Sequence, residues 1–230
     1  NYLKLVSRTY VWMIQAGFYK KKYPEIFFLK KLIHEGDTCI DIGANLGYYS
    51  YFMSKHIGAH GKLIAVEPVP LFGKIWGHNM RRLKSKNFQL FSCALGEKEG
   101  SISMGTPQIN GVLHHGMTHV IDENTENVSL KFNVQMKIAD TLFSDIEKLD
   151  FVKVDVEGYE HLVFGNMINT IDKFRPVIQS ELSGSENRSA VISLLRQYNY
   201  EAMVLRNGEL TPATDNDIES GNSDFYFIQH

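Results

Sequence analysis

The sequence predicts a doubly wound α/β fold in one domain, on three observations. An apolar run at residues 39–42 breaks at a glycine turn, and a helical pattern begins directly after it. Strand-like runs and amphipathic segments then alternate along the chain. With 230 residues, the chain is long enough for one sizeable core, so a single domain is expected.

The elements follow from apolar spacing and from glycine and proline breaks. A helical extension is expected over residues 1–36, before the main domain at 37–230. Strands are expected at 39–42, 62–67, 88–93, 100–104, 128–136, 151–156 and 177–182, with 200–206 and 224–229 as a closing antiparallel pair. Helices are expected at 25–34, 46–57, 71–83, 139–147, 159–167 and 187–198.

The glycine turn has the features of a ligand-binding turn. Gly43 allows a sharp turn with positive φ and a close approach to the backbone, and Gly47 permits close contact between helix and strand. The pattern is G-x-x-x-G, without the G-x-G-x-x-G that cradles a pyrophosphate. Asp41, just before the turn, would repel a phosphate but suit an ammonium group. This contrast favours S-adenosylmethionine over a dinucleotide.

A second carboxylate supports the same interpretation. Glu67 closes the apolar run at residues 63–66 and precedes Pro68, so it lies at a strand end. It follows Asp41 by 26 residues, near the offset at which an acid reaches a ribose hydroxyl. The alternative is structural, since many strands end on a charged residue and a lone G-x-x-x-G matches many turns.

Four blocks of sequence resemble a known family. They are IDIGANLGYYS at 40–50, VEP at 66–68, CALGEKEG at 93–100 and FVKVDVEGYEHLVFGNM at 151–167. Together they resemble the FkbM family of S-adenosylmethionine-dependent methyltransferases over residues 24–181. The resemblance implies a Rossmann-like class I methyltransferase fold: a mostly parallel seven-stranded sheet with an antiparallel edge strand and helices on both faces. It also implies S-adenosylmethionine as methyl donor and a hydroxyl acceptor on a sugar or a secondary metabolite.

The same resemblance adds two candidates to the cofactor-binding residues. In this fold the segment after the third strand contacts the adenine, which makes Cys93 and Ala94 candidates, with plain packing as the alternative. The full set of expected cofactor residues is Asp41, Gly43, Asn45, Gly47, Glu67, Cys93, Ala94 and Asp155.

Catalytic candidates come from the strand ends. The ends of the first, fourth and fifth strands converge on one crevice, which gathers Asp41, Asp155, Glu157 and Glu181. Such carboxylates can hold the amino group of the cofactor, orient or deprotonate an acceptor hydroxyl, or bind a divalent ion. Asp155 is the first candidate base, followed by Glu181 and His161. For Glu157 the alternative is a helix-start acid, and for His161 an ordinary surface position.

Residues 105–127 lose periodicity and are expected to form a loop over the acceptor site. The loop holds His114, His115 and His119, but without acidic or cysteine partners at ligand spacing, so no metal is expected.

Composition limits the partners. The net charge of −2 gives no footprint for nucleic acid, and no stretch is long and apolar enough to cross a membrane. Cys39 and Cys93 suit buried thiols in a reducing compartment, so a cytoplasmic protein is expected. The N-terminal helices could cap the sheet, line the acceptor site or form a homodimer. An NAD(P)-dependent enzyme and a protein that binds S-adenosylmethionine without turnover remain as alternatives.

Overall fold

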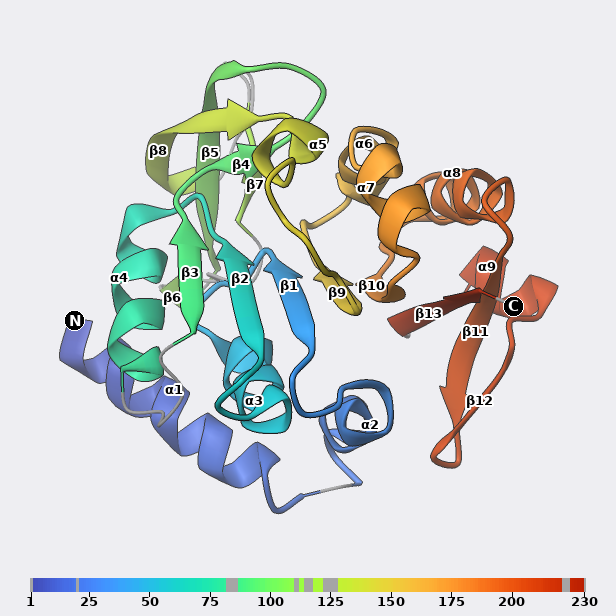
Figure 1. Cartoon of the computed structure of the whole chain (residues 1–230). Coiled ribbons are helices and arrows are strands. Elements are labelled where there is room, and N and C mark those ends of the chain that lie inside the picture. Colours follow the sequence, from blue (N-terminus) through green and yellow to red (C-terminus); the bar gives the residue numbers. More distant parts are fainter. Residues whose placement is uncertain are drawn as a thin grey trace.

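An eight-stranded sheet, parallel across most of its width, lies at the centre of the protein (Figure 1). The structure is a computed structural model that describes residues 2–19, 21–81, 87–109, 112–113, 118–121, 128–220 and 224–229. The strands stand in the order β12 (Glu209–Pro212), β11 (Tyr200–Arg206), β13 (Asp224–Gln229), β10 (Val177–Glu181), β9 (Phe151–Val154), β1 (Thr38–Ile42), β2 (Lys62–Val66) and β3 (Phe88–Phe91).

The strand pairing confirms the predicted α/β class and the closing pair. Strands β10, β9, β1, β2 and β3 run parallel, whereas β13 is inserted antiparallel between β10 and β11. The seven predicted strands of the sheet are present, and β12 adds an eighth as an antiparallel edge strand on β11. Strand β12 was not predicted, because its four residues carry no apolar alternation.

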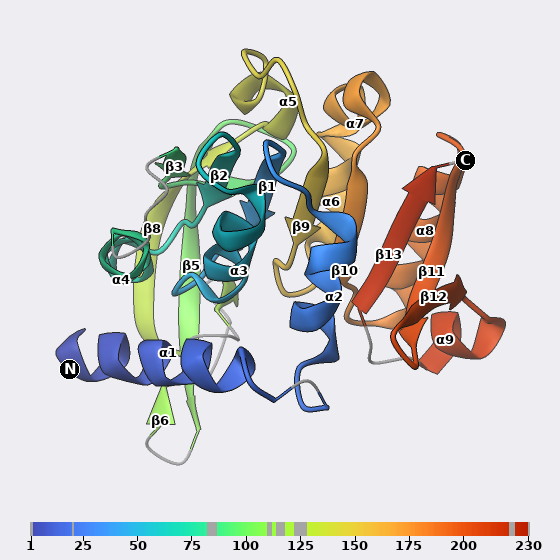
Figure 2. The ribbon, with the colours of Figure 1, turned by 60° about the horizontal axis from the view of Figure 1, so that its bottom comes forward.

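Helices cover both faces of this sheet, as Figures 1 and 2 show. Alternate residues of a buried parallel strand point to opposite faces. Cys39 and Leu63 therefore pack in one core cluster, and Ile40 and Ile64 pack in the other. The first face carries α2 (Pro24–Leu32), α3 (Tyr48–Ile57) and α4 (Pro70–Met80), with α1 (Tyr2–Ala16) packed on α3 and α4. The second carries α5 (Ala139–Leu142), α6 (Glu160–Gly165), α7 (Ile168–Phe174) and α8 (Ser185–Arg196), and α9 (Asp215–Ser220) packs on α8.

A second, five-stranded sheet was not predicted. It contains β4 (Ala94–Leu95), β8 (Val128–Lys137), β5 (Gly100–Ile109) and β6 (Val112–Leu113), with β7 (His119–Val120) paired to β5. The expected structureless loop from residue 105 is therefore wrong for the described part of that segment. Strand β5 continues to Ile109 through a bulge between Thr106 and Pro107, and the glycine and proline there conceal the strand. His114 and His115 lie outside the described residues.

Several helices are shorter than their apolar spacing predicts. Helix α4 ends at Met80, α5 ends at Leu142, and the predicted helix at 159–167 is limited to Glu160–Gly165. The separate helix α7 follows, and the Asp140 carboxylate accepts hydrogen bonds from the N–H groups of Asn169 and Thr170 in its first turn. Capping by a residue distant in sequence cannot be inferred from local periodicity.

The sharpest packing constraint lies at Gly43, directly after β1. Its φ is +80°, and a Cβ there would lie 1.8 Å from the carbonyl oxygen of Asp155. We predict that Gly43→Ala lowers the free energy of unfolding by about 3–5 kcal/mol, because it adds both overlap and a disfavoured backbone conformation. Urea denaturation measures this.

Gly77→Ala is the matched control, because it adds the same methyl group within α4, where no atom lies within 4 Å. It should stabilise the protein by about 0.5–1 kcal/mol. Equal effects of the two variants would refute the constraint at Gly43.

Candidate active site

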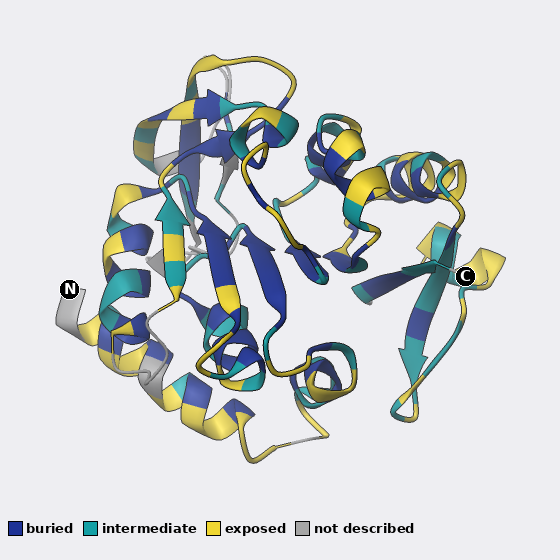
Figure 3. Ribbon diagram, in the orientation of Figure 1, coloured by how far each residue is buried: buried dark blue, intermediate teal, exposed yellow. Residues whose placement is uncertain are grey.

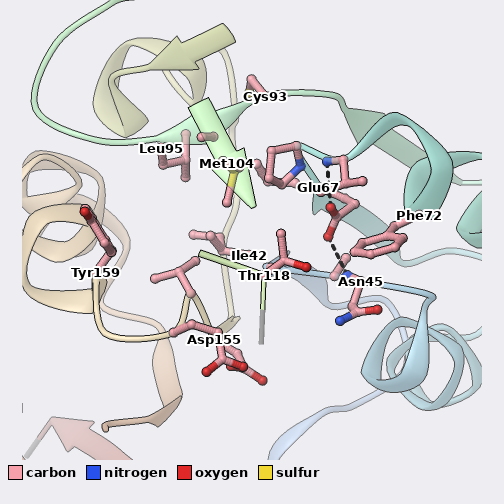
Figure 4. A pocket seen from close by; sticks show the side chains of 18 of the residues that line it. Ile42, Asn45, Glu67, Phe72, Cys93, Leu95, Met104, Thr118, Asp155 and Tyr159 are labelled. Atoms are coloured by element: carbon pink, nitrogen blue, oxygen red, sulfur yellow. Dashed lines mark hydrogen bonds between the residues drawn. The ribbon is translucent and has the colours of Figure 1, made fainter. Parts of the chain in front are cut away.

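A cavity of about 520 Å³ lies at the carboxyl ends of β1, β2, β9 and β10 (Figure 4). The turns after these strands form one part of its wall, and the second sheet forms another. Figure 4 places Glu67 with Asn45 and Phe72 on one side and Asp155 with Tyr159 on the other. The second sheet contributes mainly apolar side chains, which are Ile102, Met104, Val120 and Met136. The cavity therefore joins two polar ends through an apolar middle.

The turn after β1 has the conformation that its glycines permit. The N–H groups of Gly43 and Ala44 both donate to the Val66 carbonyl oxygen, at 3.0 and 3.1 Å. This ties the turn to the end of β2. Gly47 caps the N-terminus of α3 with a φ of 94°, and a Cβ there would approach the Trp76 ring to 3.2 Å. Gly43 therefore makes the close backbone approach that the sequence predicted, whereas the close neighbour of Gly47 is a ring on helix α4 and not the expected strand.

Glu67 lies at the end of β2 with its carboxylate fixed by the backbone. Its Oε2 accepts from the Asn45 N–H at 2.8 Å and its Oε1 from the Val69 N–H at 2.7 Å. Burial raises the pKa of Glu67 to about 7. Each carboxylate oxygen retains acceptor capacity beyond these bonds, so Glu67 can receive the two hydroxyls of a ribose.

Asp41 lies beneath the same turn and is 2% exposed. Its Oδ2 accepts a hydrogen bond from the Ser50 hydroxyl at 2.5 Å, and Ser50 in turn accepts from the Trp76 indole N–H at 2.8 Å. Burial raises the pKa of Asp41 to about 6. The chain of bonds links the end of β1 to α3 and α4. Asp41 also lines the cavity, and its expected contact with an ammonium group stays a prediction.

Lys153 on β9 is a site residue that the sequence analysis missed. Its side chain is 1% exposed, its Nζ lies 3.3 Å from Asp155 Oδ2, and it lies over the Tyr49 ring at 4.5 Å. Burial would lower the pKa of Lys153, but the surrounding carboxylates, Asp155 foremost, raise it above its ordinary value. A lysine within an otherwise apolar buried strand was a usable signal, because such a charge needs partners.

Glu157 and Glu181 line the cavity beside Asp155, as predicted from the strand ends. Burial and the neighbouring carboxylates, Asp155 foremost, raise the pKa of Glu157 to about 7. Burial and the same neighbour raise the pKa of Glu181. Glu157 has a φ of 55°, and α6 begins three residues later, so its interpretation as a helix-start acid is wrong. A positive φ is uncommon for a non-glycine residue, and among the described residues Asn45 also has one and lines the cavity.

Glu160 holds that turn in place and was also missed. Its side chain is buried, and its Oε1 accepts from the N–H groups of Val156 and Gly158, at 2.9 and 3.3 Å. Its Oε2 accepts from the Asn187 side-chain amide at 2.6 Å. The acid that stabilises the turn is therefore Glu160, at the first position of α6.

His161 does not join the other candidates. It is exposed, its Nδ1 lies 3.0 Å from Asn187 Oδ1, and it is absent from the residues that line the cavity. The surface alternative describes its position, because α6 directs this residue toward α8.

Cys93 and Ala94 line the cavity together with Leu95. All three are buried, and Cys93 and Cys39 are both free thiols. Burial raises the pKa of Cys93 to about 11, so the thiol stays protonated at neutral pH and behaves as a small apolar group. The expected contact of Cys93 and Ala94 with the adenine stays a prediction.

Within the described residues, no group of three His, Cys, Asp or Glu side chains has the geometry of a metal site. None of the helices in the described part of the chain is long and apolar enough to cross a membrane.

The strand order and the position of the cavity define a Rossmann-like class I methyltransferase fold. Solved structures with the same fold include an FkbM methyltransferase from Methylobacillus flagellatus KT, with a TM-score of 0.54 at 13% identity over 84% of this chain. The chain covers 44% of that structure's length. An rRNA methylase from Streptococcus thermophilus has a TM-score of 0.50 at 10% identity, and the match covers 91% of this chain and 95% of the methylase chain. The fibrillarin of Aeropyrum pernix with natively bound S-adenosyl-L-methionine has a TM-score of 0.50 at 14% identity. The match covers 88% of this chain and 72% of the fibrillarin chain.

The family follows from the sequence itself. Residues 41–202, more than half of the chain, match the profile described as the methyltransferase FkbM domain. The chain therefore belongs to the FkbM methyltransferase family, and S-adenosylmethionine is the cofactor of this fold and family. No protein with a curated description matches the sequence.

The first test of the cofactor site is Glu67→Ala. Loss of a charged hydrogen-bond acceptor at the ribose should weaken S-adenosylmethionine binding by about 1.5–3 kcal/mol. Calorimetric titration measures this, and Glu147→Ala, at an exposed site outside the cavity, is the control. Wild-type affinity in Glu67→Ala would rule out the ribose assignment.

The raised pKa of Glu67 predicts a pH dependence of cofactor binding. With a pKa of about 7, Glu67 is mostly protonated at pH 6 and mostly ionised at pH 8. If the ionised carboxylate binds the ribose, affinity should rise roughly tenfold over this interval. Glu67→Gln, neutral throughout, should show no such rise. A pH profile unchanged in Glu67→Gln would assign the titration to another group, such as Asp41.

Proposed function

We propose that the protein is an O-methyltransferase that uses S-adenosylmethionine to methylate a hydroxyl group of a sugar or a secondary metabolite. The observation that carries this proposal is the division of one cavity into two ends. Glu67 and the glycine turn lie at one end, which we assign to the cofactor, and Asp155 lies on the other side (Figure 4). Glu157 and Glu181 also line the cavity, and we call the end around Asp155 the acidic end. An acceptor in the acidic end would lie next to the methyl group of a cofactor in the other.

The residues present fit S-adenosylmethionine. The Glu67 carboxylate would accept hydrogen bonds from the ribose hydroxyls, and the wall of Cys93, Ala94 and Leu95 would contact the adenine. Asp41 offers negative charge for the ammonium group of the methionine part. When bound, the cofactor supplies a methyl group on a positively charged sulfur. The protein aligns the acceptor with that methyl group and removes the proton of the acceptor hydroxyl.

The acidic end favours a hydroxyl acceptor. Carboxylates accept hydrogen bonds from hydroxyls, whereas three carboxylates in one wall would repel a phosphate backbone. The net charge of −2 agrees with this. We therefore propose a small-molecule or glycan acceptor over nucleic acid, although an rRNA methylase shares the fold.

Asp155 is the proposed base. The Lys153 Nζ at 3.3 Å orients its carboxylate, and the close approach of Gly43 fixes its backbone. Glu181 and Glu157 are second candidates in the same wall. A positioned base typically raises the reaction rate by about 10²–10⁴-fold. Alignment of the reactants alone can lower the activation free energy by about 7–11 kcal/mol.

We also propose that residues 105–127 cover the acceptor. Thr118 and Val120, two of the described residues of this segment around β7, line the cavity. The apolar side chain of Val120 would help to exclude water from the transfer.

Two alternatives to this function are an NAD(P)-dependent enzyme and a protein that binds S-adenosylmethionine without turnover. Family membership and the absence of G-x-G-x-x-G both argue against an NAD(P)-dependent enzyme. A protein that binds S-adenosylmethionine without turnover would bind the cofactor but never release S-adenosylhomocysteine. Incubation with a panel of sugars and secondary metabolites, with mass spectrometry for a methylated product, separates this case from the proposed function.

We predict that Asp155→Asn loses 10²–10⁴-fold in kcat, because asparagine keeps the size but cannot accept a proton. Its dissociation constant for S-adenosylmethionine should change little. Steady-state release of S-adenosylhomocysteine and calorimetry measure the two quantities, with Asp145→Asn at an exposed site as the control. Full turnover in Asp155→Asn would reject Asp155 as the base and make Glu181 or Glu157 the next variant.

A further inference from the structure

Large exposed apolar side chains concentrate in one short segment. Among the described residues, those that are prominently exposed are Val11, Ile14, Phe18 and Tyr19, at 50%, 44%, 80% and 60%. All four fall within nine residues, on α1 and directly after it. Scattered exposed apolar residues are ordinary, but a contiguous patch marks an interaction surface.

Helix α1 has two apolar sides. Val6, Met13 and Ala16 are buried against the protein. Val11, Ile14 and Phe18 follow each other at spacings of three and four and face outward, where Figure 3 shows the exposed side of α1. Packing against α3 and α4 therefore explains the first side, whereas the second side is exposed in the described part of the chain.

The charge around the patch has one sign. Lys4 and Arg8 are exposed one turn apart on the outward side, and Lys21 and Lys22 are exposed beyond the helix. Residues 1–22 contain no Asp or Glu, and neither do α3 and α4, the helices on which α1 packs. In a chain of net charge −2, this segregation favours an anionic partner.

We propose that the outward side of α1, with Lys21 and Lys22, docks on the surface of an anionic lipid bilayer. An apolar strip flanked by Lys and Arg is the arrangement of helices that lie in the membrane interface. The 15 residues of α1 extend about 22 Å, too short to cross a hydrocarbon core of about 30 Å. A second copy is a poor alternative, because pairing would bring like charges together without any acid on α1, α3 or α4.

The docking face lies beside the cavity. Trp12 of α1 lines the cavity, and with Tyr48 it also lines a groove of about 390 Å³ that runs along α1. This step rests on the proposed function. With α1 docked on a bilayer, a hydroxyl acceptor carried on a membrane lipid could reach the site without leaving the bilayer surface. Such a lipid is the substrate class that this position favours.

Co-sedimentation with vesicles, in the absence of cofactor and acceptor, tests the docking. Because this assay does not depend on methyl transfer, its result stands even if the proposed function is wrong. The full chain should bind phosphatidylcholine vesicles that contain phosphatidylserine, bind pure phosphatidylcholine far less, and dissociate at high salt. Lys4→Gln with Arg8→Gln should weaken binding about 30-fold. Lys173→Gln with Arg196→Gln removes the same charge from α7 and α8, on the other face of the sheet, and should bind as the wild type does.

The apolar contribution is tested by Val11→Ser, Ile14→Ser and Phe18→Ser together. These side chains are exposed, so the melting temperature should stay unchanged while vesicle binding falls at least about tenfold. Three results would overturn the proposal: no preference for phosphatidylserine, equal loss in the Lys173→Gln/Arg196→Gln control, or a dimer in vesicle-free solution that the triple variant abolishes.

Discussion

The candidate site depends on the close approach of two turns, at Gly43 after β1 and at Asp155 after β9. No side chain can separate them, because a Cβ at Gly43 would overlap the Asp155 carbonyl oxygen. Parallel pairing of β1 with β9 brings the two strand ends together, and glycine allows the turns to meet. The cofactor turn and the acidic turn therefore share one cavity, although more than a hundred residues separate them in the sequence.

The same site carries charge at a cost to stability. Burial raises the pKa values of Asp41, Glu67 and Glu157 above those of an unfolded chain. Such a carboxyl holds its proton more tightly when folded, so its contribution to stability falls as pH rises from the unfolded pKa to the folded one. Buried Lys153 offsets part of this cost through its attraction to the carboxylates. Carboxylates kept despite such a cost are typical of functional sites.

Local signals in the sequence were sufficient for the α/β class, the glycine turn and five carboxylates of the cavity, because strand ends and turns carry local patterns. The second sheet was missed, since β5 and β8 stabilise each other across a long separation and β5 contains glycine and proline. Glu160 was missed for a related reason, because no local pattern identifies its partner Asn187 on α8. Lys153 was also missed, although a lysine in an apolar buried strand was a local signal for it. His161 was proposed from its position near the start of a predicted helix, and that helix directs it away from the cavity.

A crystal structure with S-adenosylhomocysteine tests the central claim most directly, because it locates the cofactor independently of any acceptor. The ribose should lie against Glu67, the adenine against Cys93, Ala94 and Leu95, and the sulfur should face the acidic end around Asp155. A ribose remote from Glu67, or a cofactor in the groove along α1, would contradict the assignment of the glycine turn as the cofactor site.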